Sequence, residues 1–122
     1  DDETLKKLQK CADVSVVPSL FEPFGIVAIE AMAAKSPIAV SDTGGLSEIV
    51  EHDATGVKVY PDNPNSLAWG ITKVLTDGEY ENWLRNNAYK RIQEKYDWDK
   101  IAHQTKTIYN DVLTDYSKSL WT

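Results

Sequence analysis

The sequence predicts an α/β protein in three layers, with helices covering both faces of a small parallel sheet. Short β-rich segments alternate with helical segments in the first half of the chain, the order that crossover connections between parallel strands produce. The β-rich segments are also apolar and rich in β-branched residues, as strands buried on both faces are. A chain of 122 residues with 42% apolar and 26% charged residues can form one compact core.

Three β-rich segments are expected to supply the strands of the sheet. The first ends at Pro18, because proline lacks the N–H group that a sheet ladder needs. Three strands make a small sheet, and the first helix of the sequence would ordinarily follow an earlier strand. The sequence therefore predicts the second half of a larger doubly wound domain. The expected strands are residues 13–19, 37–41 and 56–60.

The remaining segments have helical periodicity. In the first of them, Leu5 and Leu8 lie on one face and lysines on the other. Residues 63–66 form a loop that leads into an N-cap, and residues 117–122 have no clear pattern. No linker or repeat divides the chain, so residues 1–122 are expected to form one partial domain. The expected helices are residues 2–11, 23–34, 46–51, 67–75, 78–95 and 98–116.

Charge and composition narrow the function classes. The net charge of −6 and the pI of about 4.8 disfavour binding to nucleic acid or to anionic membrane surfaces. Cys11 is expected to be a buried thiol, and the isolated His52 and His103 predict no metal site. There is neither a signal-peptide pattern nor an apolar run that could cross a bilayer, so the cytoplasm is the expected compartment.

One helix combines apolar residues with a single carboxylate. Residues 26–34 are apolar on every face except at Glu30. A helix that is hydrophobic all round is typically buried, and a buried carboxylate needs a partner. Sugar hydroxyls suit this role because they donate to a group that can only accept. A lysine on a neighbouring helix would serve as well, so both a ligand role and a structural role stay open.

The N-terminus of the same helix is an expected anion site. Pro23 suits a first helical turn, and Gly25 would allow a ligand to approach the backbone closely. The N–H groups of residues 24–27, with the positive end of the helix dipole, would hold a diphosphate. Glu22 precedes them and suits a ligand with hydroxyls or developing positive charge, although a simple stabilisation of the helix N-terminus is the alternative.

The segment Glu22-Pro23-Phe24-Gly25, followed after seven intervening residues by Glu30, resembles the E-x7-E motif of the group 1 glycosyltransferases. These are retaining enzymes of the GT-B fold, related to glycogen and starch synthases. The resemblance implies a Rossmann-like C-terminal donor-binding domain in which residues 98–122 form the closing helix and tail. It covers nearly the whole chain, and further matching segments are residues 12–19, 30–33, 43–50 and 55–56.

The resemblance also implies roles for individual residues. Glu22 would contact the hydroxyls of the donor sugar and stabilise charge, and the amides of Phe24 and Gly25 would face that sugar. The amides of Ile26 and Val27 would hold the distal phosphate, and Glu30 would bind the ribose hydroxyls. Gly44 and Gly45 would lie beside the donor or acceptor sugar; a tight turn from strand to helix is the equally weighted alternative.

By the same resemblance, the complete protein would be a hexosyltransferase. It would transfer glucose with retention from ADP- or UDP-glucose, a substrate and not a cofactor, to an α-glucan. Mannosyl or galactosyl transfer in the same family, a non-catalytic sugar-nucleotide-binding fragment and an unrelated α/β module are the alternatives.

Two departures from the family pattern matter. The Arg/Lys pair that neutralises the leaving diphosphate and the N-terminal acceptor domain are absent from this sequence, so the isolated chain is expected to be inactive. Lys35 stands where the family usually has a glycine, which affects the helix cap and not the site.

The tryptophans are expected to serve packing more than ligand binding. Trp69, Trp83 and Trp98 lie at helical spacing with apolar neighbours and are expected in the core, while Trp121 is expected to be exposed. A helical stripe of Tyr109, Val112 and Tyr116 is expected to be core or an interdomain contact.

Overall fold

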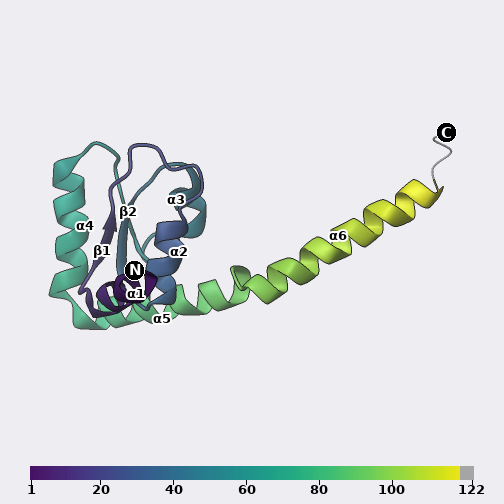
Figure 1. Cartoon of the computed structure of the whole chain (residues 1–122). Coiled ribbons are helices and arrows are strands. Elements are labelled where there is room, and N and C mark those ends of the chain that lie inside the picture. Colours follow the sequence, from purple (N-terminus) through teal and green to yellow (C-terminus); the bar gives the residue numbers. More distant parts are fainter. Residues whose placement is uncertain (119–122) are drawn as a thin grey trace.

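The computed structural model describes residues 1–118 and has a parallel sheet between layers of helices (Figure 1). The strands β1 (Ser15–Val17), β2 (Ile38–Ser41) and β3 (Val57–Val59) lie in the order β1-β2-β3. Ser15 pairs with Ile38, and Ala39 pairs with Val57. The predicted fold class is confirmed, with strands shorter than expected.

Six helices accompany the sheet in the described residues. Three begin where the sequence predicts, whereas α2 begins three residues later than expected and both α3 and α4 begin earlier. Asn63 caps α4 by accepting a hydrogen bond from the Ser66 N–H at 2.9 Å, which places Pro64 at the first helical position. The helices are α1 (Asp2–Cys11), α2 (Ile26–Ala33), α3 (Gly44–Ile49), α4 (Pro64–Thr76), α5 (Gly78–Lys95) and α6 (Trp98–Lys118).

The core lies on both faces of the sheet because side chains alternate along β2. Ile38 and Val40 pack with α2 and α3 on one face, and Ala39 packs with Val74 of α4 on the other. Helix α5 crosses below both layers and contributes to each, Ala88 to the first cluster and Leu84 to the second. The sheet and its two helical layers therefore hold the carboxyl ends of the strands in fixed positions.

The C-terminus of α2 has the geometry of a Schellman motif. The Ser36 N–H donates to the Ala31 carbonyl and the Lys35 N–H donates to the Met32 carbonyl. Lys35 has a φ of 61°, the left-handed conformation that usually selects glycine at this position. Its ammonium lies 4.4 Å from the centroid of the Tyr89 ring. The expectation that Lys35 alters the cap and not the site agrees with this placement.

Several expectations of burial are wrong. Cys11 is exposed, and α1 buries none of its residues. Trp69, Trp83 and Trp98 have exposed fractions of 49%, 58% and 82%. Helices α4 and α5 turn other residues toward the core, and α6 buries none of its residues. Trp121 lies outside the described residues.

Helix α6 leaves the body of the protein (Figure 1). None of its residues is buried, and the apolar stripe of Tyr109, Val112 and Tyr116 is exposed. The expected helix is therefore present, while its role as a closing element stays a prediction. No helix within residues 1–118 is long and apolar enough to cross a membrane.

Candidate functional site

The segment from Glu22 to Gly25 connects the carboxyl end of β1 to the N-terminus of α2. Ligands of parallel α/β sheets bind at this edge of the sheet. Glu22 is half-buried, and Phe24 is exposed. Pro23 lies outside the helix and not in its first turn as expected, because α2 begins only at Ile26.

Gly25 is the N-cap of α2 and has a left-handed φ of 102°. A Cβ at this position would lie 2.9 Å from Leu46 Cδ2 and 3.2 Å from Ile49 Cδ1. The space on the Cβ side of Gly25 is thus filled by α3. Backbone conformation and packing therefore both require glycine here, and the approach of a ligand to its backbone stays a prediction.

Gly44 and Gly45 hold the backbone of the Glu22 segment. The Gly45 N–H donates to the Glu22 carbonyl at 2.9 Å. A Cβ on Gly44 would lie 2.1 Å from the Glu22 carbonyl oxygen, and one on Gly45 would lie 2.0 Å from that of Phe24. Both glycines begin α3, so the structural role that the sequence left open is present in this close backbone contact. The contact of these glycines with a sugar stays a prediction.

The outer face of α2 is open, which corrects the expectation of a helix buried on all sides. Ile26 and Val27 have exposed fractions of 60% and 53%, and Glu30 is also exposed. Ala28 and Met32 face the core instead. Glu30 follows Ile26 by one helical turn, so these three side chains share a face. Burial therefore does not force a partner on Glu30.

The Glu30 carboxylate also lacks the ion pair that a structural role would need. Within residues 1–118, no lysine or arginine lies within ion-pair distance of it. The sequence left this structural alternative open. Its absence here leaves the carboxylate free to accept hydrogen bonds from a ligand.

The first turn of α2 presents backbone donors beside these carboxylates. The Ala28 N–H donates to the Gly25 carbonyl at 3.0 Å, which begins the helical ladder. The N–H groups of Ile26 and Val27 come before it and have no acceptor within the helix. They lie at the positive end of the helix dipole. Residues 22–30 contain no cationic side chain, so within this segment only backbone donors can bind negative charge.

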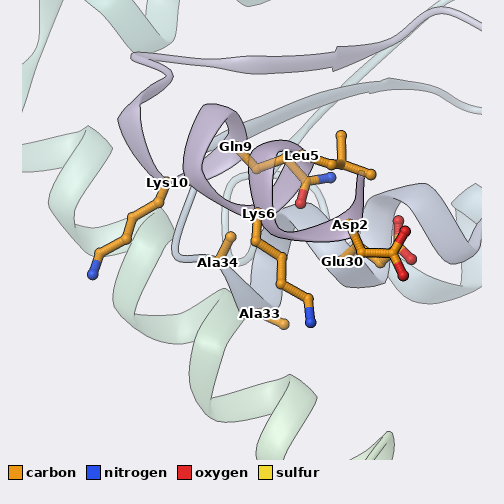
Figure 2. Close-up of a pocket in the computed structure, with 8 residues that line it drawn as sticks. All are labelled: Asp2, Leu5, Lys6, Gln9, Lys10, Glu30, Ala33 and Ala34. Atoms are coloured by element: carbon orange, nitrogen blue, oxygen red, sulfur yellow. The ribbon is translucent and has the colours of Figure 1, made fainter.

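Glu30 opens into a pocket of about 540 Å³ between α1 and α2 (Figure 2). Leu5, Lys6 and Gln9 of α1 line it with Glu30. The volume falls in the range of small-molecule sites. The lining combines Leu5 and two alanines with Gln9 and four charged side chains, those of Asp2, Lys6, Lys10 and Glu30. The sequence did not predict that α1 contributes here. Only the amphipathic pattern of residues 2–11 pointed to a partner for this helix.

The turn that carries Gly44 is fixed by a charged cluster at Asp42. The Ser47 hydroxyl donates to Asp42 at 2.6 Å, and Lys58 Nζ lies 3.2 Å from the same oxygen. The hydrogen bond from Ser47, with that from Lys58, lowers the pKa of Asp42 against the opposing effect of desolvation. Asp42 thus stays ionised near neutral pH. The described residues contain no group of three or more His, Cys, Asp or Glu side chains that could hold a metal ion.

Comparison with known proteins gives a consistent result. The family profile described as glycosyl transferases group 1 matches residues 1–91. An uncharacterised glycosyltransferase of Methanocaldococcus jannaschii is 55% identical over 107 residues, which are 88% of this chain and 27% of that protein. The glycogen synthase of Mycobacterium tuberculosis is 38% identical over 109 residues, 89% of this chain and 26% of that protein. The chain thus spans about a quarter of the length of these relatives.

Solved structures resemble the chain over most of its length. The sucrose-phosphate synthase of Thermosynechococcus elongatus superposes with a TM-score of 0.88 at 39% identity, covering 94% of this chain and 29% of that one. The Anabaena protein HepE in complex with UDP-glucose superposes with a TM-score of 0.80 at 28% identity, covering 85% of this chain and 29% of that one.

Proposed function

The chain belongs to the group 1 glycosyltransferases and has the GT-B fold, and from this premise we propose that residues 22–30 hold the donor for hexosyl transfer. The observation that carries the proposal is the arrangement around the first turn of α2. Two carboxylates, Glu22 and Glu30, flank backbone donors that have no helical acceptor. A sugar nucleotide has hydroxyls on its sugar and on its ribose, with the negatively charged diphosphate between them. This order matches a carboxylate, backbone donors and a second carboxylate.

The diphosphate is assigned to the N-terminus of α2. The amides of Ile26 and Val27 would bind the distal phosphate, supported by the helix dipole. Glu30, one turn further along the same face, would accept hydrogen bonds from the ribose hydroxyls. The pocket between α1 and α2 would then receive the nucleoside, with Leu5 as its apolar surface.

Glu22 is assigned to the donor sugar. The Gly45 N–H holds its backbone beside the start of α3, and we assign its carboxylate to the mouth of the site. There it would accept hydrogen bonds from sugar hydroxyls and stabilise the positive charge that develops at the reacting carbon. The amides of Phe24 and Gly25 are assigned to the same sugar. Glu22 has no assigned role as a covalent nucleophile or a base.

The reaction we propose is transfer of glucose with retention to an α-glucan. Attack and departure would occur on one face of the sugar, and the leaving diphosphate would help to accept the proton of the acceptor hydroxyl. The proposal of a glucose donor is supported by the UDP-glucose complex of HepE, and that of a glucan acceptor by similarity to a glycogen synthase. The nucleotide is UDP or ADP; transfer of mannose or galactose is the alternative within the family.

A Glu30→Gln variant tests the donor site. Glu30 is exposed and without an ion pair in the described residues, so the change should leave the Tm unaltered. Hydrogen bonds to a charged group contribute about 1.5–3 kcal/mol, so affinity for UDP-glucose, measured by calorimetry, should fall at least about tenfold.

Glu48→Gln is the matched control, because Glu48 is also an exposed glutamate on a helix, in this case α3. It should bind UDP-glucose as the unaltered chain does. Equal affinity of Glu30→Gln and the unaltered chain would refute the donor assignment. A lower Tm with unchanged affinity would favour a structural role of Glu30.

A further inference from the structure

A second pocket, of about 690 Å³, lies between the carboxyl end of β3 and the start of α4. We call it the aromatic pocket. It does not include Glu22 or Glu30. Its lining includes three aromatic rings, two amides and a hydroxyl: His52, Tyr60, Trp69, Asn63, Asn65 and Ser66.

The rings of this pocket are exposed, and those of His52 and Trp69 are also held by contacts. Tyr60 is 74% exposed and Trp69 is about half exposed. The His52 ring lies 6.2 Å from the Trp69 ring, and its Nδ1 accepts a hydrogen bond from the Lys58 N–H at 3.0 Å. Lys73 Nζ lies 5.1 Å from the centroid of the Trp69 ring. Fixed aromatic surfaces lose little entropy when a ligand covers them, so they are suited to binding.

The charge of the pocket favours a neutral ligand. Asp42 and Lys58 both line it and form an ion pair at 3.2 Å. Lys58 Nζ also donates to the Ser47 carbonyl at 2.7 Å. The cation is thus already engaged, and a phosphate would have to displace both interactions.

The polar groups of the pocket suit a ligand with many hydroxyls. Asn63 accepts a hydrogen bond from the Ser66 N–H through its oxygen, which leaves its amide hydrogens to donate. The Ser66 oxygen accepts from the Tyr60 N–H, so its hydroxyl hydrogen can point to a ligand. Asn65 adds an exposed amide. Donors, acceptors and flat apolar rings together match a saccharide, which has hydroxyls at its edges and C–H groups on its faces.

The aromatic pocket also continues toward the end of β1. A smaller hollow of about 190 Å³ shares Tyr60 and Asn63 with it and extends to Pro18 and Leu20, at the end of β1. Leu20 is anchored by the Thr43 hydroxyl, which donates to its carbonyl at 3.3 Å. A chain of sugar units could therefore lie along the carboxyl edge of the sheet toward Glu22.

We propose that the aromatic pocket is a second saccharide site, which binds a neutral glycan chain on the faces of Tyr60 and Trp69. The site is separate from the donor site. Its chemistry alone indicates a neutral saccharide; the choice of an α-glucan as ligand rests on the proposed function. A failure of this saccharide site can be distinguished from a failure of the proposed donor site, because glycan binding is measured without any nucleotide.

Maltoheptaose is the probe, and its affinity for the chain is measured by calorimetry. Trp69→Ala and Tyr60→Ala should each weaken binding about tenfold, since each removes one stacking surface. Trp83→Ala is the matched control, because Trp83 is similarly exposed but lies on α5 outside the pocket. It should bind maltoheptaose as the unaltered chain does. All three variants should bind UDP-glucose equally.

Three results would contradict a saccharide site in the aromatic pocket. Unchanged affinity in both Trp69→Ala and Tyr60→Ala, or no binding of maltoheptaose by the unaltered chain, would overturn the proposal. Displacement of maltoheptaose by UDP would also overturn it, because the two sites would then be one. If Trp69→Ala lowers the Tm, Tyr60→Ala decides, since its ring is the more exposed. Glu30→Gln should lower the affinity for UDP-glucose and leave the affinity for maltoheptaose unchanged.

Discussion

Gly45 has no room for a side chain, because a Cβ would lie 2.0 Å from the Phe24 carbonyl oxygen. The clash is with backbone, which cannot turn away as a flexible side chain can. Gly45→Ala should therefore push the Glu22 segment away from α3. We expect the free energy of unfolding, measured in urea, to fall by about 3 kcal/mol, with weaker binding of UDP-glucose.

Gly78→Ala is the control for this prediction. A Cβ at Gly78 would meet nothing within 4 Å, and the residue lies at the start of α5. Alanine there should be neutral or stabilising by up to about 1 kcal/mol. If Gly45→Ala is as stable as the unaltered chain, the close contact between the two backbones is not a constraint on the fold.

At the same scale, Glu30 shows how far single residues could be predicted. The sequence singled it out as the one carboxylate of an apolar helix and, through the resemblance to the E-x7-E motif, by its spacing from Glu22. The structure places it on the open face of α2 beside a pocket. The reason given from the sequence, burial on all sides, is wrong. Apolar residues such as Ile26 and Val27 do not reveal whether their face is covered. For Gly25, the sequence indicated a position that needs glycine. Its packing against Leu46 depends on the fold and could not be predicted.

At the scale of the elements, Arg91 ties α5 to the end of α3. Its Nε donates to the Ile49 carbonyl at 2.8 Å, and its Nη2 donates to the Glu48 carbonyl at 2.9 Å. It also pairs with Glu51. These carbonyls end a helix and have no helical donor. Arg91→Met should lower the free energy of unfolding by about 2 kcal/mol, measured in urea.

The neighbouring Lys90 provides the comparison. Its side chain is exposed and pairs with Glu94 at 3.9 Å on the same helix. Lys90→Met should change the stability by less than about 0.5 kcal/mol. Equal effects of the two substitutions would show that Arg91 contributes no more than a surface charge.

Helix boundaries were predictable where the signal is local. The Asp77 side chain accepts from the Glu79 and Tyr80 N–H groups, and α5 begins at Gly78 as expected. The start of α2 was not predictable, because the left-handed Gly25 replaces a side-chain cap and is fixed by packing on α3. Trp69 lies on the predicted helix, but its side chain is half exposed and not in the core as the sequence predicted. Hydrophobic periodicity indicates which residues share a face of a helix, but it does not indicate whether another element covers that face.

At the scale of the whole molecule, Asp53, in the loop before β3, joins α4 and α5 and should make stability depend on pH. Burial raises its pKa, but hydrogen bonds from Lys73 and Tyr80 outweigh this, so the pKa lies below the ordinary value of 3.8. A carboxyl whose pKa is lowered by folding stabilises the protein above its unfolded pKa, and this contribution is lost as the pH falls through the folded pKa. The Tm should therefore decline below about pH 4.

Asp53→Asn tests this dependence by calorimetry at pH 7 and pH 3. The variant should have a lower Tm at pH 7 and a smaller decline on acidification, because the ionised partner of Lys73 is gone. Asp111→Asn on the exposed α6 should decline as the unaltered chain does. An identical acid response in all three would assign the effect to other carboxylates.

The proposed site as a whole should bind a donor without completing transfer. Residues 22–30 supply two carboxylates and backbone amides, but no cationic side chain for the leaving diphosphate. Loss of one donor aimed at developing charge costs about a hundredfold to a thousandfold in rate. With UDP-glucose bound, the 122-residue chain should thus transfer no radiolabelled glucose to maltoheptaose above a protein-free blank. Transfer that Glu22→Gln abolishes would contradict this, because it would place a complete catalytic centre within these residues.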